Sequence, residues 1–453
     1  MTFPSYQEYK DSSGEWIGAI PAHWSVSPLK RGFMIEGGST PPPDEINWDG
    51  DIAWVTPADL SGLTSFFLDT SKRTITDTGL ASCGTSLLPA GSLILSTRAP
   101  IGSLAIALIR MCTNQGCKGL IPNESAFSTY FAYVLLTAKT ELNIRGKGTT
   151  FLEISGDELG RFDVPMPPLS EQTQIARFLD HETARIDALI EEQKRLIELL
   201  KEKRQAVISH AVTKGLDPTV PMKDSGVEWL GEVPAHWGKK RLKNISPFIT
   251  VGIVVNPSDY VSDEGLPFLY GGEVKEGFIE VDKARKISPE DSKKNRKTML
   301  ETGDIVTMRV GYPGLTAVVP PECAGGNCAS VMLVKRGNYD SHWLCAVMNS
   351  RLVRQQVEVV QYGAAQKQFN IADAIEFWMF EPPREEQTTI SEFIDRQSSV
   401  FNALMEESEG SMQLLKERRS ALISAAVTGK IDVRGWQPPA STQAPESVVA
   451  EAS

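Results

Sequence analysis

The sequence predicts an α+β fold in which two β-rich mixed domains are joined by two long helices in a pseudo-twofold internal repeat. Three observations lead to this prediction. Two motifs recur in the second half of the chain at a nearly constant interval, as expected for an internal repeat. Two long segments carry apolar residues at heptad spacing, which predicts helices. Short apolar runs ending in Gly/Pro turns lie between them, which predicts strands.

The first repeated motif opens each half of the chain. Residues 14–24 read GEWIGAIPAHW and residues 227–237 read VEWLGEVPAHW. Trp16 recurs as Trp229, 213 residues later. Because His23 is repeated within this motif, it is predicted to belong to a packed structural corner and not to a ligand set.

The second repeated motif opens and closes a helical segment. Residues 168–173, PLSEQT, recur as PREEQT at 383–388, and LKEKR at 200–204 recurs as LKERR at 415–419. Duplication without functional meaning is the alternative. It does not explain why the helices stay alike while the intervening domains diverge, a pattern that suits two modules with different targets on one frame.

The two helical segments are predicted to pair with each other as a long coiled coil. Residues 170–212 contain neither Pro nor Gly, whereas Gly410 weakens the middle of the copy at about 385–427. Ser170 is expected to cap the first helix, with the Glu171 carboxylate in its first turn. Packing against a neighbouring domain is the alternative, and either relative direction is open. The predicted a and d positions are Ile175, Leu179, Ile186, Leu189, Leu196, Leu200, Ile390, Ile394, Phe401, Leu404, Leu415 and Leu422.

These patterns divide the chain into five parts. The β-rich domains are assigned to residues 1–165 and 216–382, and the helical segments to 166–215 and 383–433. The tail, 434–453, contains Pro, Ser and Ala in excess and is predicted to be disordered.

Composition excludes several classes of protein. The chain has 453 residues, 41% of them hydrophobic, with no apolar run long enough to cross a bilayer and no signal-peptide pattern at its start. A cytoplasmic location is therefore expected. Six cysteines without any sign of secretion argue against a disulfide framework.

A formal net charge of −11 argues mildly against nucleic-acid binding, but nucleic acids respond to local patches of charge. One such patch lies between residues 283 and 297 and suits phosphate contacts, although a solvated surface is the alternative. Its predicted contact residues are Lys283, Lys293, Lys294 and Arg296.

Candidate base-reading residues follow a strand in each domain. Arg98 and Arg309 stand at equivalent strand ends before Gly/Pro turns, where a guanidinium could reach guanine or phosphate; a structural salt bridge is the alternative. A basic Gly-rich loop at 145–150 and its counterpart at 363–368 could approach a nucleic acid or be plain solvated turns. Their predicted contact residues are Lys147, Thr149, Thr150, Gln366 and Lys367.

Motifs for catalysis are not found. The sequence has no Asn/Asp-Pro-Pro-aromatic methyltransferase motif, no Gly-rich cofactor loop and no phosphate loop. Glu273-Val274-Lys275 could suggest a nuclease, but such short matches arise by chance. The pair Cys112 and Cys117 has the spacing of Cys323 and Cys328, yet buried thiols are favoured over zinc ligands, so no metal site is predicted.

At this point the chain resembles a known family. The Pro-Ala-His-Trp motif at 21–24, the helix start at 168–176 and the helix end at 200–213 look like those of specificity subunits of type I restriction–modification systems. The resemblance covers residues 13 to about 433 and occurs twice.

The resemblance implies two target-recognition domains, each reading one half of a bipartite double-stranded DNA site. It also implies two antiparallel helical spacers that set the distance between the halves and dock two modification subunits. Those subunits would carry S-adenosylmethionine and methylate adenine at N6, and restriction subunits would add cleavage that depends on ATP and Mg²⁺. This chain would bind no cofactor and catalyse nothing. A standalone DNA-binding scaffold, or an enzyme with a site that the motifs miss, are the alternatives.

Overall fold

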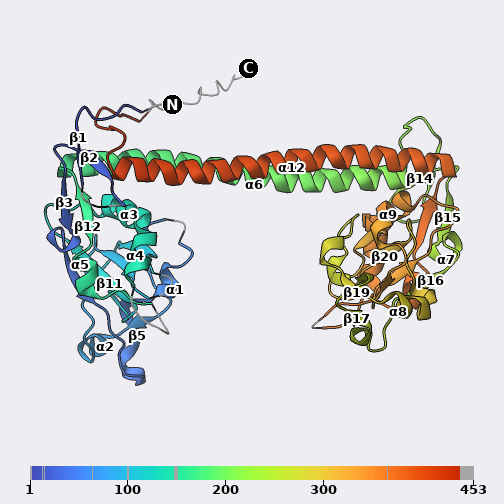
Figure 1. The fold of residues 1–453 in the computed structure, drawn as a ribbon, viewed down its shortest axis with the longest axis horizontal. Helices are drawn as coiled ribbons and strands as arrows, with labels where there is room; N and C mark the ends of the chain where they lie inside the picture. The colour runs from blue at the N-terminus through green and yellow to red at the C-terminus, as the bar shows by residue number, and fades with distance from the viewer. Residues whose placement is uncertain are drawn as a thin grey trace, which may run out of the picture. The chain divides into compact units, whose positions relative to one another are not determined.

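The computed structural model describes residues 3–12, 14, 16–63, 65–98, 101–146, 152–364 and 366–438. It consists of two compact units, residues 1–193 with 411–453 (unit 1) and residues 194–410 (unit 2). Two long helices, α6 (Leu169–Lys214) and α12 (Arg384–Val427), each contribute one part of their length to each unit (Figure 1).

The core of unit 1 is a five-stranded sheet in the order β4-β11-β8-β9-β6, and all neighbours are antiparallel except β6 and β9. Its strands are β4 (Phe33–Gly37), β6 (Phe67–Leu68), β8 (Leu93–Ser96), β9 (Leu104–Ala107) and β11 (Cys117–Pro122). The side chains of β8 alternate between two cores: Leu93 and Leu95 pack with helix α3 (Ser128–Thr137), whereas Ile94 packs on the opposite side of the sheet.

A smaller sheet in unit 1 has the order β10-β5-β7. Two further strand pairs, β1 with β2 and β3 with β12, complete the unit. These strands are β1 (Tyr9–Asp11), β2 (Ala19–Pro21), β3 (Ser25–Pro28), β5 (Trp48–Val55), β7 (Thr74–Ile75), β10 (Met111–Thr113) and β12 (Asp163–Met166). The short helices are α1 (Pro57–Leu60), α2 (Asp77–Ala81), α4 (Lys139–Arg145) and α5 (Gly156–Gly160).

Unit 2 has sheets in the orders β16-β23-β20-β21 and β17-β19-β18-β22, and the pairs β13 with β14 and β15 with β24. The first sheet contains β16 (Ile249–Val251), β20 (Ile305–Thr307), β21 (Thr316–Val318) and β23 (Met332–Val334). The second contains β17 (Val261–Ser262), β18 (Leu266–Leu269), β19 (Arg285–Ile287) and β22 (Asn327–Cys328). The pairs are β13 (Met222–Asp224), β14 (Glu232–Pro234), β15 (Gly238–Arg241) and β24 (Trp378–Glu381). The helices are α7 (Leu242–Ile245), α8 (Pro289–Lys294), α9 (Ser341–Asn349), α10 (Arg351–Val360) and α11 (Ile371–Ala374).

Strand register confirms the internal repeat. In unit 1 the central strand β8 pairs antiparallel with β9 and β11, and in unit 2 the central strand β20 pairs in the same way with β21 and β23. Leu93 lies opposite Ile106 and Leu120, as Ile305 lies opposite Val318 and Val334. The predicted α+β class with two repeated β-rich domains is therefore confirmed.

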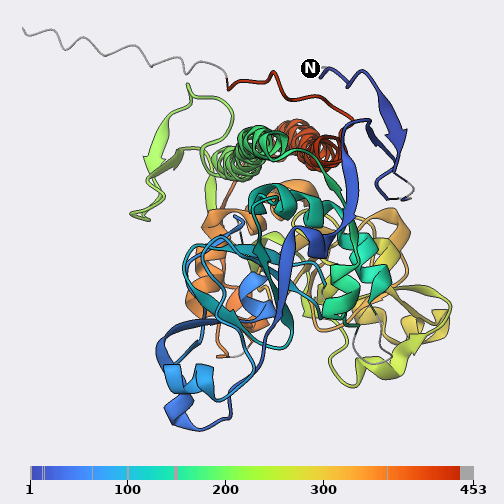
Figure 2. The ribbon, with the colours of Figure 1, turned by 90° about the vertical axis from the view of Figure 1, so that its left-hand side faces the viewer.

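The halves of α6 and α12 within each unit pack antiparallel. In unit 1, Asp187 pairs with Arg419 while Gln174, earlier in α6, bonds to Val433 beyond the end of α12. In unit 2, Arg204 on α6 donates a hydrogen bond to Asn402 at 2.7 Å. The segment after α12 returns to the start of the chain, where the Asp432 amide donates to the carbonyl of Pro4 (Figure 2).

The buried seam of α6 differs by one residue from part of the predicted stripe. Leu179 and Ile186 are buried as predicted, but Leu189 and Leu196 are 40% and 42% exposed. Ile175, from the same predicted series, is buried as predicted, and further buried positions lie one residue, or about 100°, beyond this series along the helix. They are Ala176, Thr183, Ile190 and Ile197, all buried.

On α12 the predicted positions Ile390, Ile394 and Phe401 are buried, whereas Leu404 is 42% exposed. Leu200, Leu415 and Leu422 are half-buried. A two-helix pair buries only a narrow stripe, so leucines beside that stripe stay on the surface. The helix α6 also begins at Leu169, which places Ser170 inside the helix and not at its cap.

Candidate functional site

In unit 1, Arg98 joins the end of β8 to a loop that closes at Glu153. Its Nε donates to Glu153 Oε2 at 3.0 Å, and the two residues form an isolated β-bridge. The salt bridge left open as an alternative is thus present, with both side chains partly exposed. The predicted contact residues Lys147, Thr149 and Thr150 lie outside the described part of the chain.

Unit 2 anchors the equivalent loop differently. Arg309 Nε donates to the carbonyl oxygen of Phe369 at 3.2 Å, and backbone bridges join Val310 and Tyr362 to Gln368. Residues 362–368 therefore form a tight hairpin turn. Gln366 and Lys367 are exposed on this turn. Arg309 thus contacts the residue that follows this turn, as Arg98 contacts Glu153 in unit 1.

The basic cluster of unit 2 is partly neutralised. Lys283 donates to Glu280 at 2.8 Å and holds the pKa of that carboxyl below its usual range. Lys294 pairs with Asp291 at 3.1 Å, and this contact raises the pKa of the lysine. Lys293 and Arg296 form no ion pair with any described residue, so within this cluster they carry uncompensated positive charge on or beside α8.

The Pro-Ala-His-Trp motifs are structural corners, as predicted. In unit 1 the Glu171 carboxylate accepts hydrogen bonds from Trp24 Nε1 and Tyr6 Oη, both at 3.0 Å, and lies 2.6 Å from His23 Nε2. In unit 2 Glu386 repeats this arrangement. Its carboxylate accepts from Trp237 Nε1 at 3.1 Å and lies 2.8 Å from His236 Nε2. Each corner fixes the start of a domain to the first turn of a long helix.

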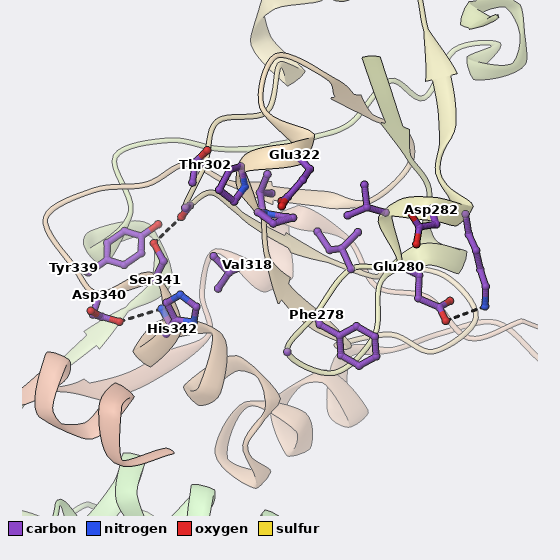
Figure 3. Close-up of a pocket in the computed structure, with 18 of the residues that line it drawn as sticks. Phe278, Glu280, Asp282, Thr302, Val318, Glu322, Tyr339, Asp340, Ser341 and His342 are labelled. Carbon is purple, nitrogen blue, oxygen red and sulfur yellow. Dashed lines mark hydrogen bonds and ion pairs between the residues drawn. The ribbon is translucent and has the colours of Figure 1, made fainter. Parts of the chain in front are cut away.

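A hollow of about 950 Å³ in unit 2 lies beside the start of α9 (Figure 3). Asp340 accepts from the backbone N–H of His342 and caps the helix, and Ser341 Oγ donates to the Gly303 carbonyl at 2.6 Å. Glu280 is held by its lysines. Asp340, Ser341 and Glu280 therefore serve the fold, and the described residues include no cluster of His, Cys, Asp or Glu suited to a metal ion.

The cysteines behave as buried thiols. Burial raises the pKa of Cys112, Cys117 and Cys328 to about 12, well above the range in which thiolates act. Their matched spacing does not reflect matched positions: Cys112 lies opposite Trp54 on β5, whereas Asn327 lies opposite the equivalent residue of β18, Phe268.

The acid-x-Lys string is also used within the fold. The Glu273 carboxylate accepts from the Tyr270 backbone N–H at 2.7 Å, and Lys275 lies 3.4 Å from Glu280.

None of the helices in the described part of the chain is both long and apolar enough to span a membrane.

The geometry defines a class: a protein with two homologous β-rich modules, each with an arginine close after its central strand and each fixed by a carboxylate corner to a long helix. Residues 21–199 match the family described as type I restriction modification DNA specificity domain. The curated relatives below are specificity subunits of type I restriction enzymes as well, so the chain is similar to proteins of this family.

Similarity to relatives extends over nearly the whole chain. The MjaIX specificity subunit of Methanocaldococcus jannaschii is 26% identical over 436 residues, which cover 94% of this chain and 97% of that protein. The EcoR124I/EcoR124II specificity subunit of Escherichia coli is 30% identical over 171 residues, or 36% of this chain and 42% of that protein.

Solved structures share the fold. A chain from a type I R-M system has a TM-score of 0.71 at 17% identity and covers 91% of this chain and 99% of its own length. The HsdS subunit from Thermoanaerobacter tengcongensis has a TM-score of 0.55 at 16% identity. The match covers 91% of this chain and 98% of that subunit.

Proposed function

We propose that the chain reads a bipartite double-stranded DNA site, each domain recognising one half, and that it guides a type I restriction–modification complex to that site. The observation that carries the proposal is the repeat itself. The corners and helices of the two units match, whereas the loops anchored by Arg98 and Arg309 differ in sequence and in their hydrogen bonds. A shared frame with different exposed loops suits two different DNA half-sites.

Modification subunits are the proposed partners on the helices. Large apolar side chains stay exposed on α6 and α12, with Leu199 54% and Leu414 67% exposed. Large apolar side chains left exposed on a helix suit burial against a partner protein. S-adenosylmethionine, ATP and Mg²⁺ are proposed to act in the partner subunits.

Two equivalent hollows support a stoichiometry of two modification subunits. In unit 1 a hollow of about 750 Å³ is lined by Phe67, Asp187 and Arg419. In unit 2 one of about 530 Å³ is lined by the matching Phe278, Asn402 and Arg204. Two copies of one surface on one chain suit the same partner bound twice.

The isolated chain is expected to show no methyl transfer and no DNA cleavage, because the proposal assigns both reactions to partners. The measurement is a methylation assay on DNA from a host without the system, with the chain alone and after co-expression with its modification subunit. Methylation of a two-part motif only by the complex supports the proposal. Robust methylation or cleavage by the chain alone would overturn it.

Loop variants are expected to affect one half-site each. Lys147→Ala should weaken reading of one half, and Lys367→Ala the other, with a loss of about 1–3 kcal/mol at one base pair for a base contact. Arg98→Ala and Arg309→Ala should act on the same halves by releasing the loops. Binding of the complex to a library of half-site variants measures this, and equal changes in both halves would contradict one domain per half.

A further inference from the structure

Each unit holds an arginine stacked on a pair of aromatic rings. In unit 1 the Arg73 guanidinium carbon lies 3.6 Å from the Trp48 ring centroid, and Trp48 meets the buried Trp54 edge to face at 5.1 Å. In unit 2 the Arg285 guanidinium carbon lies 4.2 Å from the Tyr270 ring, which meets the buried Phe268 at 5.1 Å. Both stacks thus run from a buried ring through an outer ring to an exposed guanidinium.

Strand register makes the two arginines equivalent. The backbone N–H of Trp54 donates to the Arg73 carbonyl at 3.1 Å, so Arg73 lies opposite Trp54 as Arg285 lies opposite Phe268. Each arginine stands two residues before a buried isoleucine, Ile75 on β7 or Ile287 on β19. The next residue in each copy caps a short helix with its hydroxyl: these capping residues are Thr76 and Ser288.

The outer rings of the two stacks are not equivalent. Trp48 comes from the start of β5, whereas Tyr270 follows the end of β18. The two domains therefore reach the same stacked arginine through different aromatic residues. The arginine occurs at the same position in both domains although the ring beneath it differs. This suggests that the guanidinium itself has a function, beyond covering the ring.

Neither guanidinium is used elsewhere in the fold. Arg73 and Arg285 are exposed, and neither forms an ion pair or a side-chain hydrogen bond with any residue that the structure describes. This is notable for Arg73, because Asp69 and Asp77 flank it closely in sequence. A cation held on a ring face without a carboxylate keeps its N–H groups available to a ligand.

In each unit, residues close to the stack in sequence pack near residues that adjoin the loop anchor. In unit 2, Gly271, next to Tyr270, is packed so closely on Met308 that a Cβ there would lie 3.2 Å from Met308 Cγ, and Met308 precedes Arg309. In unit 1, a Cβ on Gly116 would lie 3.1 Å from Pro57 at the start of α1, and the Gly116 carbonyl accepts from the Thr97 amide, next to Arg98, at 2.9 Å.

The charge around the two stacks differs. Lys283, Lys286 and Lys293 accompany Arg285, whereas Arg73 has one lysine, Lys72, and two aspartates, Asp69 and Asp77, close to it in sequence. The two sites therefore share the arginine held over an aromatic ring, and not the charge of the residues around it. A planar guanidinium held over a ring presents two parallel N–H groups, which match guanine O6 and N7.

We propose that Arg73 and Arg285 are a matched pair of base-reading residues, one per domain, each recognising a guanine edge in its own half of the DNA site. This inference rests on the proposed function of the chain. The aromatic stack orients the fork before DNA binds, which reduces the entropy lost on binding.

The test uses the full chain co-expressed with its modification subunit, with Arg73→Lys and Arg285→Lys. Lysine keeps the charge but loses the planar fork. Each variant should bind the recognised sequence roughly 5- to 150-fold more weakly and lose preference at one G·C pair, with the other half unchanged. Arg110→Lys and Arg336→Lys, at exposed arginines without a stack, are the matched controls and should bind like the unaltered chain.

The outcomes separate the alternatives. If the complex that contains the unaltered chain methylates no two-part motif, the proposed function itself is wrong. With that motif present, unchanged binding of both variants would overturn the assignment. A uniform loss over all sequences, with the salt slope reduced by about one, would mean a phosphate contact and overturn base reading. A lower melting temperature with both halves altered would mean that the arginines only cover the rings.

Discussion

Replacing Glu171 by alanine is expected to lower the free energy of unfolding by about 3 kcal/mol or more, because two buried donors lose their acceptor. Trp24 is fully buried and Tyr6 is 5% exposed, so water does not readily replace the carboxylate. His23 is more exposed and can be rehydrated. Since whole domains are stable by about 5–15 kcal/mol, this is a large share of the total. Denaturant unfolding followed by tryptophan fluorescence measures it.

The second corner supplies a graded control. Glu386 accepts from Trp237 and contacts His236, but no tyrosine hydroxyl is bonded to it in the described structure, and its side chain is 28% exposed. Glu386→Ala should therefore destabilise by roughly half as much. Glu385→Ala, on the exposed neighbour, should change little. Equal stability of the Glu171→Ala and Glu385→Ala chains would show that the corner does not support the fold.

The corner also shows why part of this fold could be predicted from the sequence. A motif that recurs with its tryptophan and histidine intact indicates a structural role without any knowledge of the partner. The partner itself was out of reach, because Glu171 lies far along the chain from Trp24 and satisfies the ordinary pattern of a first-turn carboxylate. Only the fold shows that the Glu171 side chain lies in the first turn of α6 and also accepts the hydrogen bond from Trp24.

The helical stripe illustrates a different limit. Hydrophobicity identified Leu179 and Ile186 because they are large and apolar. The companion seam begins with Ala176 and Thr183, which carry little apolar signal, while Leu189 and Leu196 carry much and lie outside the seam. Pattern reading assigns the most hydrophobic series to the core, whereas a two-helix pair buries the series that is geometrically opposite its neighbour.

The candidate site was predicted only in part, for a related reason. Arg98 and Arg309 could be found because each follows a strand at a turn, but their partners could not. Arg73 escaped notice because its ring partner, Trp48, comes from another strand, and only the pairing of β5 with β7 brings them together. A sequence signal did exist: arginine, any residue, isoleucine and a hydroxyl cap occur at both 73–76 and 285–288.

Lengthening the paired helices by one heptad is expected to lengthen the gap in the DNA motif without changing its halves. Because Asp187 faces Arg419, the position after Glu191 faces Leu415. Residues 185–191 would be duplicated after Glu191, and residues 415–421 before Leu415. This keeps the apolar seam in phase on both helices and duplicates the Asp187–Arg419 pair.

Seven helical residues add about 10 Å, which is near three base pairs at about 3.4 Å each. The added pairs also rotate one half-site by roughly a quarter turn, so affinity should fall to the extent that DNA or helices must twist. The measurement is the motif methylated by the complex in cells. A four-residue duplication at the same places, which breaks the heptad phase, is the control and should abolish assembly. Neither β-rich domain is altered, so the two half-site sequences should stay the same. A gap about three base pairs longer would show that helix length sets the spacing between them. A stable, active seven-residue variant with an unchanged gap would mean that contacts other than helix length set the spacing.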